Sequence, residues 1–276
     1  MRFNFHPSFL RPSFLYTQSP VTCNLPAVSD RVKRKRLDLL LTERGLVASR
    51  EQARRLIMAG AVVANEQRVD KPGALVEATA ALRVKAEARP PYVSRGGQKL
   101  EAALRAFNLD VTGAVALDVG ASTGGFTDCL LQHGATKVFA VDVGYGQLAW
   151  SLRQDPRVVN LERRNIRTLN PAELPETPTL AVIDVSFISL SIVIPKVLEL
   201  IAPHGRLIAL LKPQFEVGKG RVGKGGVVRD PALHAEVGAR LRAQAEEWQV
   251  EVKGEIESPL RGPKGNKEFL FHLQKR

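Results

Sequence analysis

Four charged residues that lie far apart along the chain are the strongest candidates for chemistry. Asp184 and Lys212 end short apolar segments, Glu268 precedes one, and Lys99 opens a helical pattern. Parallel strands present their carboxyl ends at one edge of a sheet, and an antiparallel last strand presents its amino end there, so the four can converge. A lysine beside carboxylates is usually a structural ion pair, but charges clustered at a ligand-binding edge also form reaction centres. We therefore expect these four residues to form a catalytic cluster.

A glycine-rich turn in "ALDVGASTGGFTDCLL" joins an apolar segment to a helical pattern. In a strand–turn–helix unit, glycines let the backbone approach a ligand beside the start of the helix, and here they are Gly120, Gly124 and Gly125. Their D-x-G-x-x-x-G-G spacing differs from the G-x-G-x-x-G of a dinucleotide site that holds a pyrophosphate. S-adenosylmethionine has no phosphate, carries an amino-acid tail and bears a sulfonium charge. We therefore expect this turn to bind S-adenosylmethionine.

Three polar residues at successive strand ends extend the predicted cofactor site. Asp118 could hold the amino group of the cofactor, either directly or through water. Asp142 lies 24 residues further on, near the spacing at which an acid meets ribose hydroxyls. Asn165 could hydrogen-bond the adenine edge. Each residue alone would more often be an ordinary loop residue, but the ordered set favours a cofactor site.

The elements that must position these residues are apolar segments that alternate with helical patterns from about residue 100 onward. The candidate strands are "AVALDVG", "KVFAVDVG", "RVVNLER", "TLAVIDVSF" and "RLIALLKP", followed by "VEVKGEIES" and "EFLFHLQ", which we expect to be antiparallel. The pattern predicts an α/β fold in which residues 91–276 form a Rossmann-like, seven-stranded methyltransferase sheet. A small N-terminal α+β domain and its linker occupy residues 36–90.

The small domain has the signals of two short helices followed by strands. "RLDLLLTERG" predicts the first helix, and "SREQARRLIMAG" predicts the second, with Ser49 and Gln52 in capping-box positions. "AVVANEQRV" predicts a hairpin about Asn65 and Glu66, and a further turn and strand follow. Arginines on the helices either solubilise the domain or bind RNA phosphates. The arginines are Arg36, Arg50, Arg54 and Arg55.

A second basic segment, "GKGRVGKGG", matches part of a phosphate-loop pattern. Gly225 stands where that pattern requires the Ser or Thr that meets magnesium, so we do not expect a nucleoside triphosphate site. We expect instead a loop near Lys212 whose basic residues face RNA phosphates. These residues are Lys219, Arg221 and Lys224.

Composition limits the classes of partner and compartment. The net charge of +12 over 276 residues favours polyanions over acidic small molecules. Cys23 and Cys129 form no disulfide framework and have no metal-ligand spacing, which predicts a cytoplasmic protein without a metal. The segment "LSIVIPKVLELIAP" is interrupted by a proline and charges, well short of the roughly 18 apolar residues of a membrane helix. We expect a soluble chain without a membrane partner.

Residues 1–35 differ from the rest of the chain. They mix aromatic residues with prolines, carry an excess of basic residues and show neither a helical nor an alternating period. We expect a disordered basic extension. A targeting role, or a start codon assigned too far upstream, stays open.

From about residue 36 to its end, the chain resembles the TlyA family of ribosomal RNA methyltransferases, often labelled hemolysin A. The catalytic domain of that family is similar to the FtsJ ribose methyltransferases, and "SREQARRLIMAGAVVAN" resembles the RNA-binding domain named after small-subunit ribosomal protein four. The resemblance implies ribosomal RNA or ribosomal subunits as partners and cytidines in 16S or 23S RNA as substrates. It also implies a Lys-Asp-Lys-Glu tetrad, matched here by Lys99, Asp184, Lys212 and Glu268.

The implied reaction moves a methyl group from S-adenosylmethionine to a ribose 2′-hydroxyl. That hydroxyl is a poor nucleophile, so attack needs in-line positioning and removal of its proton as the bond forms. Lys212 is the candidate base or the group that stabilises the developing alkoxide. Lys99 nearby would favour the neutral amine that a base requires, whereas the two carboxylates would favour the ammonium, so both roles stay open. The other three residues of the tetrad are expected to position the reactants.

Two other function classes remain as alternatives. A non-catalytic RNA chaperone would not need the intact cofactor turn that this chain carries. A membrane-lytic protein would need a spanning or strongly amphipathic segment, and the sequence offers no persuasive one. The methylated nucleotide and the oligomeric state are not determined by the sequence.

Overall fold

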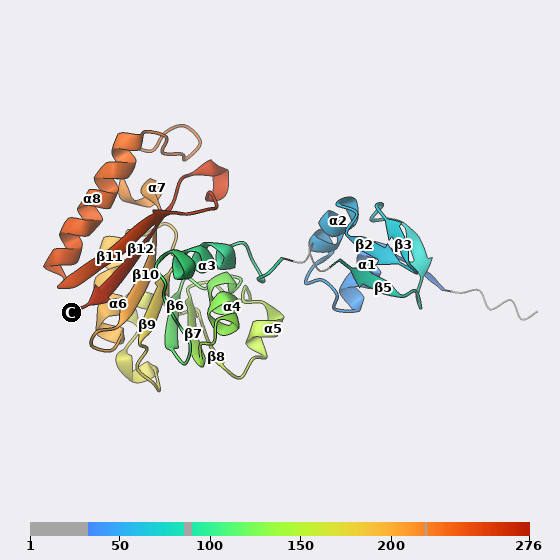
Figure 1. The fold of residues 1–276 in the computed structure, drawn as a ribbon, viewed down its shortest axis with the longest axis horizontal. Helices are drawn as coiled ribbons and strands as arrows, with labels where there is room; N and C mark the ends of the chain where they lie inside the picture. The colour runs from blue at the N-terminus through green and yellow to red at the C-terminus, as the bar shows by residue number, and fades with distance from the viewer. Residues whose placement is uncertain (1–32, 86–89, 219) are drawn as a thin grey trace, which may run out of the picture.

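The computed structural model describes residues 33–85, 90–218 and 220–276 (Figure 1). Residues 33–85 form a small α+β module with two sheets, ordered β3-β2-β5 and β1-β4. Its elements are β1 (Arg34–Arg36), α1 (Leu37–Glu43), α2 (Arg50–Met58), β2 (Val62–Ala64), β3 (Gln67–Val69), β4 (Leu75–Glu77) and β5 (Leu82–Val84).

The predicted helices of the small module pack through their apolar faces. Leu37 and Leu41 of α1 and Ile57 of α2 are fully buried in one core cluster. Ser49 caps α2 by accepting a hydrogen bond from the Gln52 backbone nitrogen at 3.2 Å. The Gln52 side chain accepts from the Ala48 nitrogen, 2.9 Å away, instead of the Ser49 nitrogen, so only half of the predicted capping box forms.

The small module begins earlier than residue 36, where we placed its boundary. Arg34–Arg36 forms β1, which pairs antiparallel with β4, from Arg34 opposite Glu77 to Arg36 opposite Leu75. Three consecutive basic residues have no apolar pattern, so this strand depends on its partner rather than on its own sequence. Residues 1–32 of the predicted disordered extension lie outside the described residues.

The larger part of the chain confirms the predicted seven-stranded sheet, in the order β11-β12-β10-β9-β6-β7-β8. Strands β8, β7, β6, β9 and β10 are parallel, while β12 runs antiparallel to both β10 and β11. The strands are β6 (Val115–Val119), β7 (Lys137–Asp142), β8 (Val158–Glu162), β9 (Leu180–Ile183), β10 (Arg206–Leu211), β11 (Val250–Glu257) and β12 (Phe269–Lys275).

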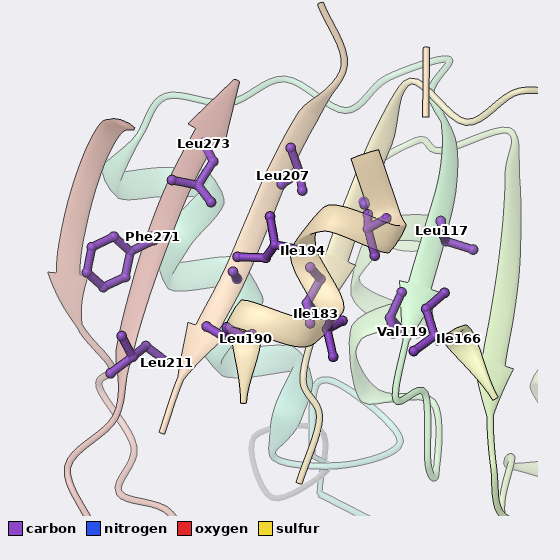
Figure 2. Packing of buried hydrophobic residues seen from close by; sticks show 14 of the residues in the cluster. Leu117, Val119, Ile166, Ile183, Leu190, Ile194, Leu207, Leu211, Phe271 and Leu273 are labelled. Atoms are coloured by element: carbon purple, nitrogen blue, oxygen red, sulfur yellow. The ribbon is translucent and has the colours of Figure 1, made fainter. Parts of the chain in front are cut away.

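Helices cover both faces of this sheet, because neighbouring strand residues point to opposite sides. Leu117 packs in a cluster with α6 and α8, shown in part in Figure 2, whereas Ala116 packs in a second cluster with α3 and α4. The helices are α3 (Gly96–Ala106), α4 (Gly125–Gln132), α5 (Trp150–Arg153), α6 (Leu190–Leu200), α7 (Pro213–Glu216) and α8 (Pro231–Glu247), and the short 3-10 turns are η2 (Ile166–Thr168), η3 (Pro171–Glu173) and η4 (Pro263–Gly265).

This topology gathers the predicted chemistry at one edge of the sheet. Gly120, Asp184 and Lys212 directly follow the parallel strands β6, β9 and β10, and Glu268 directly precedes the antiparallel strand β12. None of the helices in the described residues combines the length and the apolar character needed to span a membrane.

Candidate active site

The four charged residues form two ion pairs at the edge of the sheet. Lys99 Nζ lies 2.5 Å from Glu268 Oε2, and Lys212 Nζ lies 2.6 Å from Asp184 Oδ1. Lys212 Nζ also donates a hydrogen bond to Ser186 Oγ at 3.1 Å. The lysines and Glu268 are buried, and all four residues line one cavity of about 660 Å³. The structure therefore brings the whole predicted cluster to one place.

Close packing of α3 against the start of α4 helps to set the position of Lys99. A Cβ on Gly125 would lie 2.2 Å from Ser94 Oγ and 2.9 Å from the Gly97 nitrogen, so only glycine allows this approach. The Glu268 carboxylate also depends on a neighbouring glycine for its space, because a Cβ on Gly262 would lie 2.1 Å from Glu268 Oε1. That oxygen is buried and has no hydrogen-bond partner among the described residues.

Gly120 joins the glycine turn to the cluster of four charged residues. It has a φ of +86°, and a Cβ at this position would lie 2.6 Å from the Asp184 carbonyl oxygen. Its need for glycine therefore comes from the contact between the ends of β6 and β9 as well as from its left-handed backbone. Gly120 lines the cluster's cavity and a second cavity of about 1110 Å³.

The second cavity is lined by polar residues at the end of β7 and in the segment that follows β8. The Asp142 carboxylate accepts hydrogen bonds from the backbone nitrogens of Ser122 at 2.8 Å and Gly144 at 2.6 Å, which fix its orientation. Asn165 Oδ1 accepts from the Arg167 nitrogen at 3.1 Å and leaves its amide NH₂ as the donor available to a ligand. The two cavities share the wall formed by Gly120, Ser122, Asp184, Ser186, Phe187, Gln214, Phe215 and Val222.

Two residues predicted to contact the cofactor lie behind these cavities and line neither of them. Asp118 is fully buried and accepts a hydrogen bond from Thr127 Oγ1 at 2.6 Å. Burial raises the pKa of Asp118 to about 7, although the Thr127 hydrogen bond opposes this effect. Gly124, with a φ of +92°, makes room for Leu152, whose Cδ1 would lie 2.3 Å from an added Cβ. This placement suits support of the turn rather than contact with a ligand.

The sequence analysis singled out only Gly120 and Asp184 of the shared wall and missed the other residues, among them Phe187, Gln214 and Phe215. Phe187 is 91% exposed with a φ of +66°, and its ring centroid lies 5.1 Å from that of Phe215. Gln214 follows Lys212 by two positions and lines both cavities. The only available signal was proximity to Asp184 in "DVSF" and to Lys212 in "KPQFE".

Glu216 connects the loops that carry Asp184 and Lys212. Its carboxylate accepts hydrogen bonds from Ser189 Oγ at 2.6 Å and from the Leu190 nitrogen at 2.8 Å. Glu216 therefore ties the end of α7 to the start of α6 and holds the two sides of the shared wall together.

The four arginines predicted to bind RNA fall into two groups. Arg36 and Arg50 each lie 2.9 Å from Oδ2 of the fully buried Asp38. The hydrogen bond from Arg36 is the largest of the interactions that hold the pKa of Asp38 well below its usual range. Arg54 and Arg55 are exposed on α2, and no ion pair ties them to any other described residue.

Two of the three predicted cations of the basic loop after α7 are described, and they differ in whether their charge is paired. Lys219 lies outside the described residues. Arg221 donates two hydrogen bonds of 2.6 Å to the Glu236 carboxylate, so its charge is already engaged, while Lys224 is exposed. Val222 of this loop lines both cavities. Within the described part of the chain, no group of three His, Cys, Asp or Glu residues is arranged to hold a metal.

Comparison with known proteins relates both parts of the chain to described families. An FtsJ-like methyltransferase model matches residues 92–275, and an S4 domain model matches residues 35–81. The 16S/23S rRNA (cytidine-2'-O)-methyltransferase TlyA of Mycobacterium tuberculosis is 48% identical and covers 88% of this chain and 90% of its own. Hemolysin A of Brachyspira hyodysenteriae is 39% identical, and the match covers 86% of this chain and 99% of that protein.

A solved structure agrees with these relatives. A Streptococcus thermophilus protein named as a hemolysin has 46% sequence identity and a TM-score of 0.68, with coverage of 88% of this chain and 89% of that one. The catalytic-domain match spans the seven-stranded sheet and both ion pairs, and the S4 match spans most of the small module. This chain, which combines an FtsJ-like methyltransferase domain with an S4 domain, belongs to the TlyA family.

Proposed function

We propose that this enzyme transfers a methyl group from S-adenosylmethionine to the 2′-hydroxyl of a cytidine in 16S or 23S ribosomal RNA. The observation that carries the proposal is the wall shared by two cavities: one cavity holds both lysine–carboxylate pairs, and the other holds Asp142 and Asn165. A methyl donor in one cavity and an acceptor hydroxyl in the other would meet at this wall. The cytidine, the 2′-position and the ribosomal RNA come from the TlyA relative.

The residues of the larger cavity fit S-adenosylmethionine. Asp142 keeps acceptor capacity for ribose hydroxyls beyond the two backbone hydrogen bonds that orient it, and the Asn165 NH₂ can donate to the adenine edge. Gly120 keeps side-chain atoms out of both cavities at the turn. When bound, the cofactor supplies an electrophilic methyl group on a sulfonium.

We assign Lys212 to the acceptor hydroxyl. Asp184 and Ser186 hold its amino group at the shared wall, where it can take the hydroxyl proton or stabilise the negative charge that develops on the oxygen. The Lys99–Glu268 pair lines the same cavity and fixes a second cation there. We assign positioning of the nucleotide to Lys99, Asp184 and Glu268.

The RNA would be held outside the catalytic cavity by exposed basic residues. Arg54 and Arg55 of the S4 domain and Lys224 of the glycine-rich loop are exposed and suited to phosphate contacts. Phe187 exposes an aromatic face at the shared wall, on which an unstacked base can pack. Ribosomal subunits are the proposed partners and the cytoplasm is the proposed compartment, because the TlyA relative is named as an enzyme that methylates 16S and 23S rRNA.

The proposal is tested by incubating the protein with 30S and 50S subunits and methyl-labelled S-adenosylmethionine. We expect mass spectrometry of the digested RNA to show labelled 2′-O-methylcytidine. A Lys196→Ala variant, which removes a lysine of α6 that pairs with Glu199, serves as a control and should give the same product. Label on a base, or no label in either subunit, would contradict the proposal.

A further inference from the structure

Gln214 carries a hydrogen-bonding group without a partner at the centre of the site. It lies in α7, separated from Lys212 only by Pro213, and lines both cavities. Its carboxamide oxygen is buried and accepts no hydrogen bond from the residues that the structure describes. Since a buried oxygen without a donor costs free energy, a side-chain rotation that turns this oxygen into the cavity is favoured when a bound molecule donates a hydrogen bond to it.

The position of Gln214 relates it to one part of the proposed substrate. A 2′-hydroxyl that meets Lys212 is carried by C2′, which is bonded to the C1′ that carries the base. The base of the reacting nucleotide therefore lies within a few bonds of the atom that Lys212 contacts, close to α7. Phe187 and Phe215 add apolar area for a flat base to the wall that contains Gln214.

We propose that Gln214 determines base specificity by accepting a hydrogen bond from the exocyclic amino group of the target base. This inference rests on the proposed function. Cytosine presents its N4 amino group as a donor at the position where uracil presents the O4 acceptor. Uracil would set one carbonyl oxygen against another and leave the buried amide oxygen unsatisfied, unless the amide turned over.

The test compares subunits that carry either cytidine or, by substitution in the rRNA gene, uridine at the methylated position. We expect the wild-type enzyme to methylate the cytidine roughly tenfold faster or more than the uridine, as measured by the observed single-turnover rate constants at subsaturating enzyme. Gln214→Ala should slow the cytidine reaction and bring the ratio of the two rates close to one. Gln214→Glu should keep the preference, because a carboxylate only accepts hydrogen bonds. Gln98→Ala in α3, outside both cavities, is the matched control and should change neither rate.

Three outcomes would overturn the inference. Gln214→Ala could slow both substrates by the same factor, or Gln214→Glu could methylate uridine as fast as cytidine. Weaker S-adenosylhomocysteine binding by Gln214→Ala in calorimetry without RNA would instead assign Gln214 to the cofactor. If the wild-type enzyme methylates the cytidine and the uridine substrates at equal rates, only this inference is refuted. If it forms no 2′-O-methylcytidine, the proposed function is refuted.

Discussion

Lys212 is the residue whose replacement tests the reaction most directly. Its amino group contacts Asp184 and Ser186 at the shared wall, and its loss removes the group that we propose acts on the reacting hydroxyl. We expect Lys212→Ala to slow single-turnover methylation by about 100-fold or more at saturating RNA and cofactor. Lys212→Arg keeps the positive charge, but a guanidinium is a poor base. Activity in Lys212→Arg but not in Lys212→Ala would therefore favour charge stabilisation over proton abstraction. Near-wild-type rates in both variants would remove Lys212 from the mechanism.

The buried Asp118 carboxyl should make the free energy of unfolding depend on pH. Because burial raises its pKa to about 7 while an unfolded aspartate titrates near roughly 3.9, the folded state holds this proton more tightly than the unfolded state. The associated stability is complete below pH ~4 and is lost as the pH rises towards 7. The wild-type free energy of unfolding should therefore fall relative to that of Asp118→Asn between pH 5 and 7, by up to about 1.4 kcal/mol per pH unit. Urea denaturation of the cofactor-free protein measures this, and parallel curves for the two proteins would contradict it.

At the scale of elements, the glycine turn between β6 and α4 couples the two cavities. Gly120→Ala would add a Cβ 2.6 Å from the Asp184 carbonyl oxygen, so it should displace the end of β9 as well as strain the turn. We expect S-adenosylhomocysteine affinity in calorimetry to fall about tenfold or more.

A matched glycine separates contact from backbone strain in that experiment. Gly113 also has a positive φ, +74°, but an added Cβ there would meet nothing within 4 Å. Gly113→Ala should therefore introduce a similar backbone strain and lower the free energy of unfolding by roughly 1 kcal/mol, while the affinity for S-adenosylhomocysteine stays at the wild-type value. Equal losses of affinity in both variants would show that the turn acts only through overall stability.

At the scale of the whole molecule, RNA affinity should depend on the free arginines of the S4 domain. Arg54→Glu with Arg55→Glu should weaken binding and reduce the magnitude of the slope of log K against log salt by about 1 to 2, because fewer counterions are released. Filter binding at several salt concentrations measures both quantities. Arg50→Glu would be a poor choice, because it sets a carboxylate against the buried Asp38 and disturbs the fold.

A charge-matched control tests whether this effect is local. Arg105→Glu with Lys253→Glu changes the net charge by the same amount at positions on α3 and β11 that line neither cavity. We expect a much smaller change in the salt slope for this pair. Equal changes in both double variants would mean that the protein's overall charge, rather than the S4 domain, determines RNA affinity.

The sequence alone determined the strands of the large sheet, the helices of the small module and the edge at which the chemistry gathers, but not strand β1. Apolar segments, helical periods and glycine turns are local signals, and they predicted all seven strands of the large sheet and both helices of the small module. Because the ends of strands are set by these signals, the convergence of the four charged residues at one edge also followed from them, whereas the pairing of each lysine with its carboxylate did not.

Only the tertiary structure decided which polar groups face a cavity and which are used internally. Asp118 and Asp142 both belong to strands of one sheet, yet packing buries the first against Thr127 and exposes the second to the larger cavity. Burial of Asp38 engages two of the four arginines, and the meeting of α7 with the loop after β9 creates the wall that holds Gln214. These outcomes depend on contacts between segments far apart in the chain, and a local pattern contains no information about such contacts.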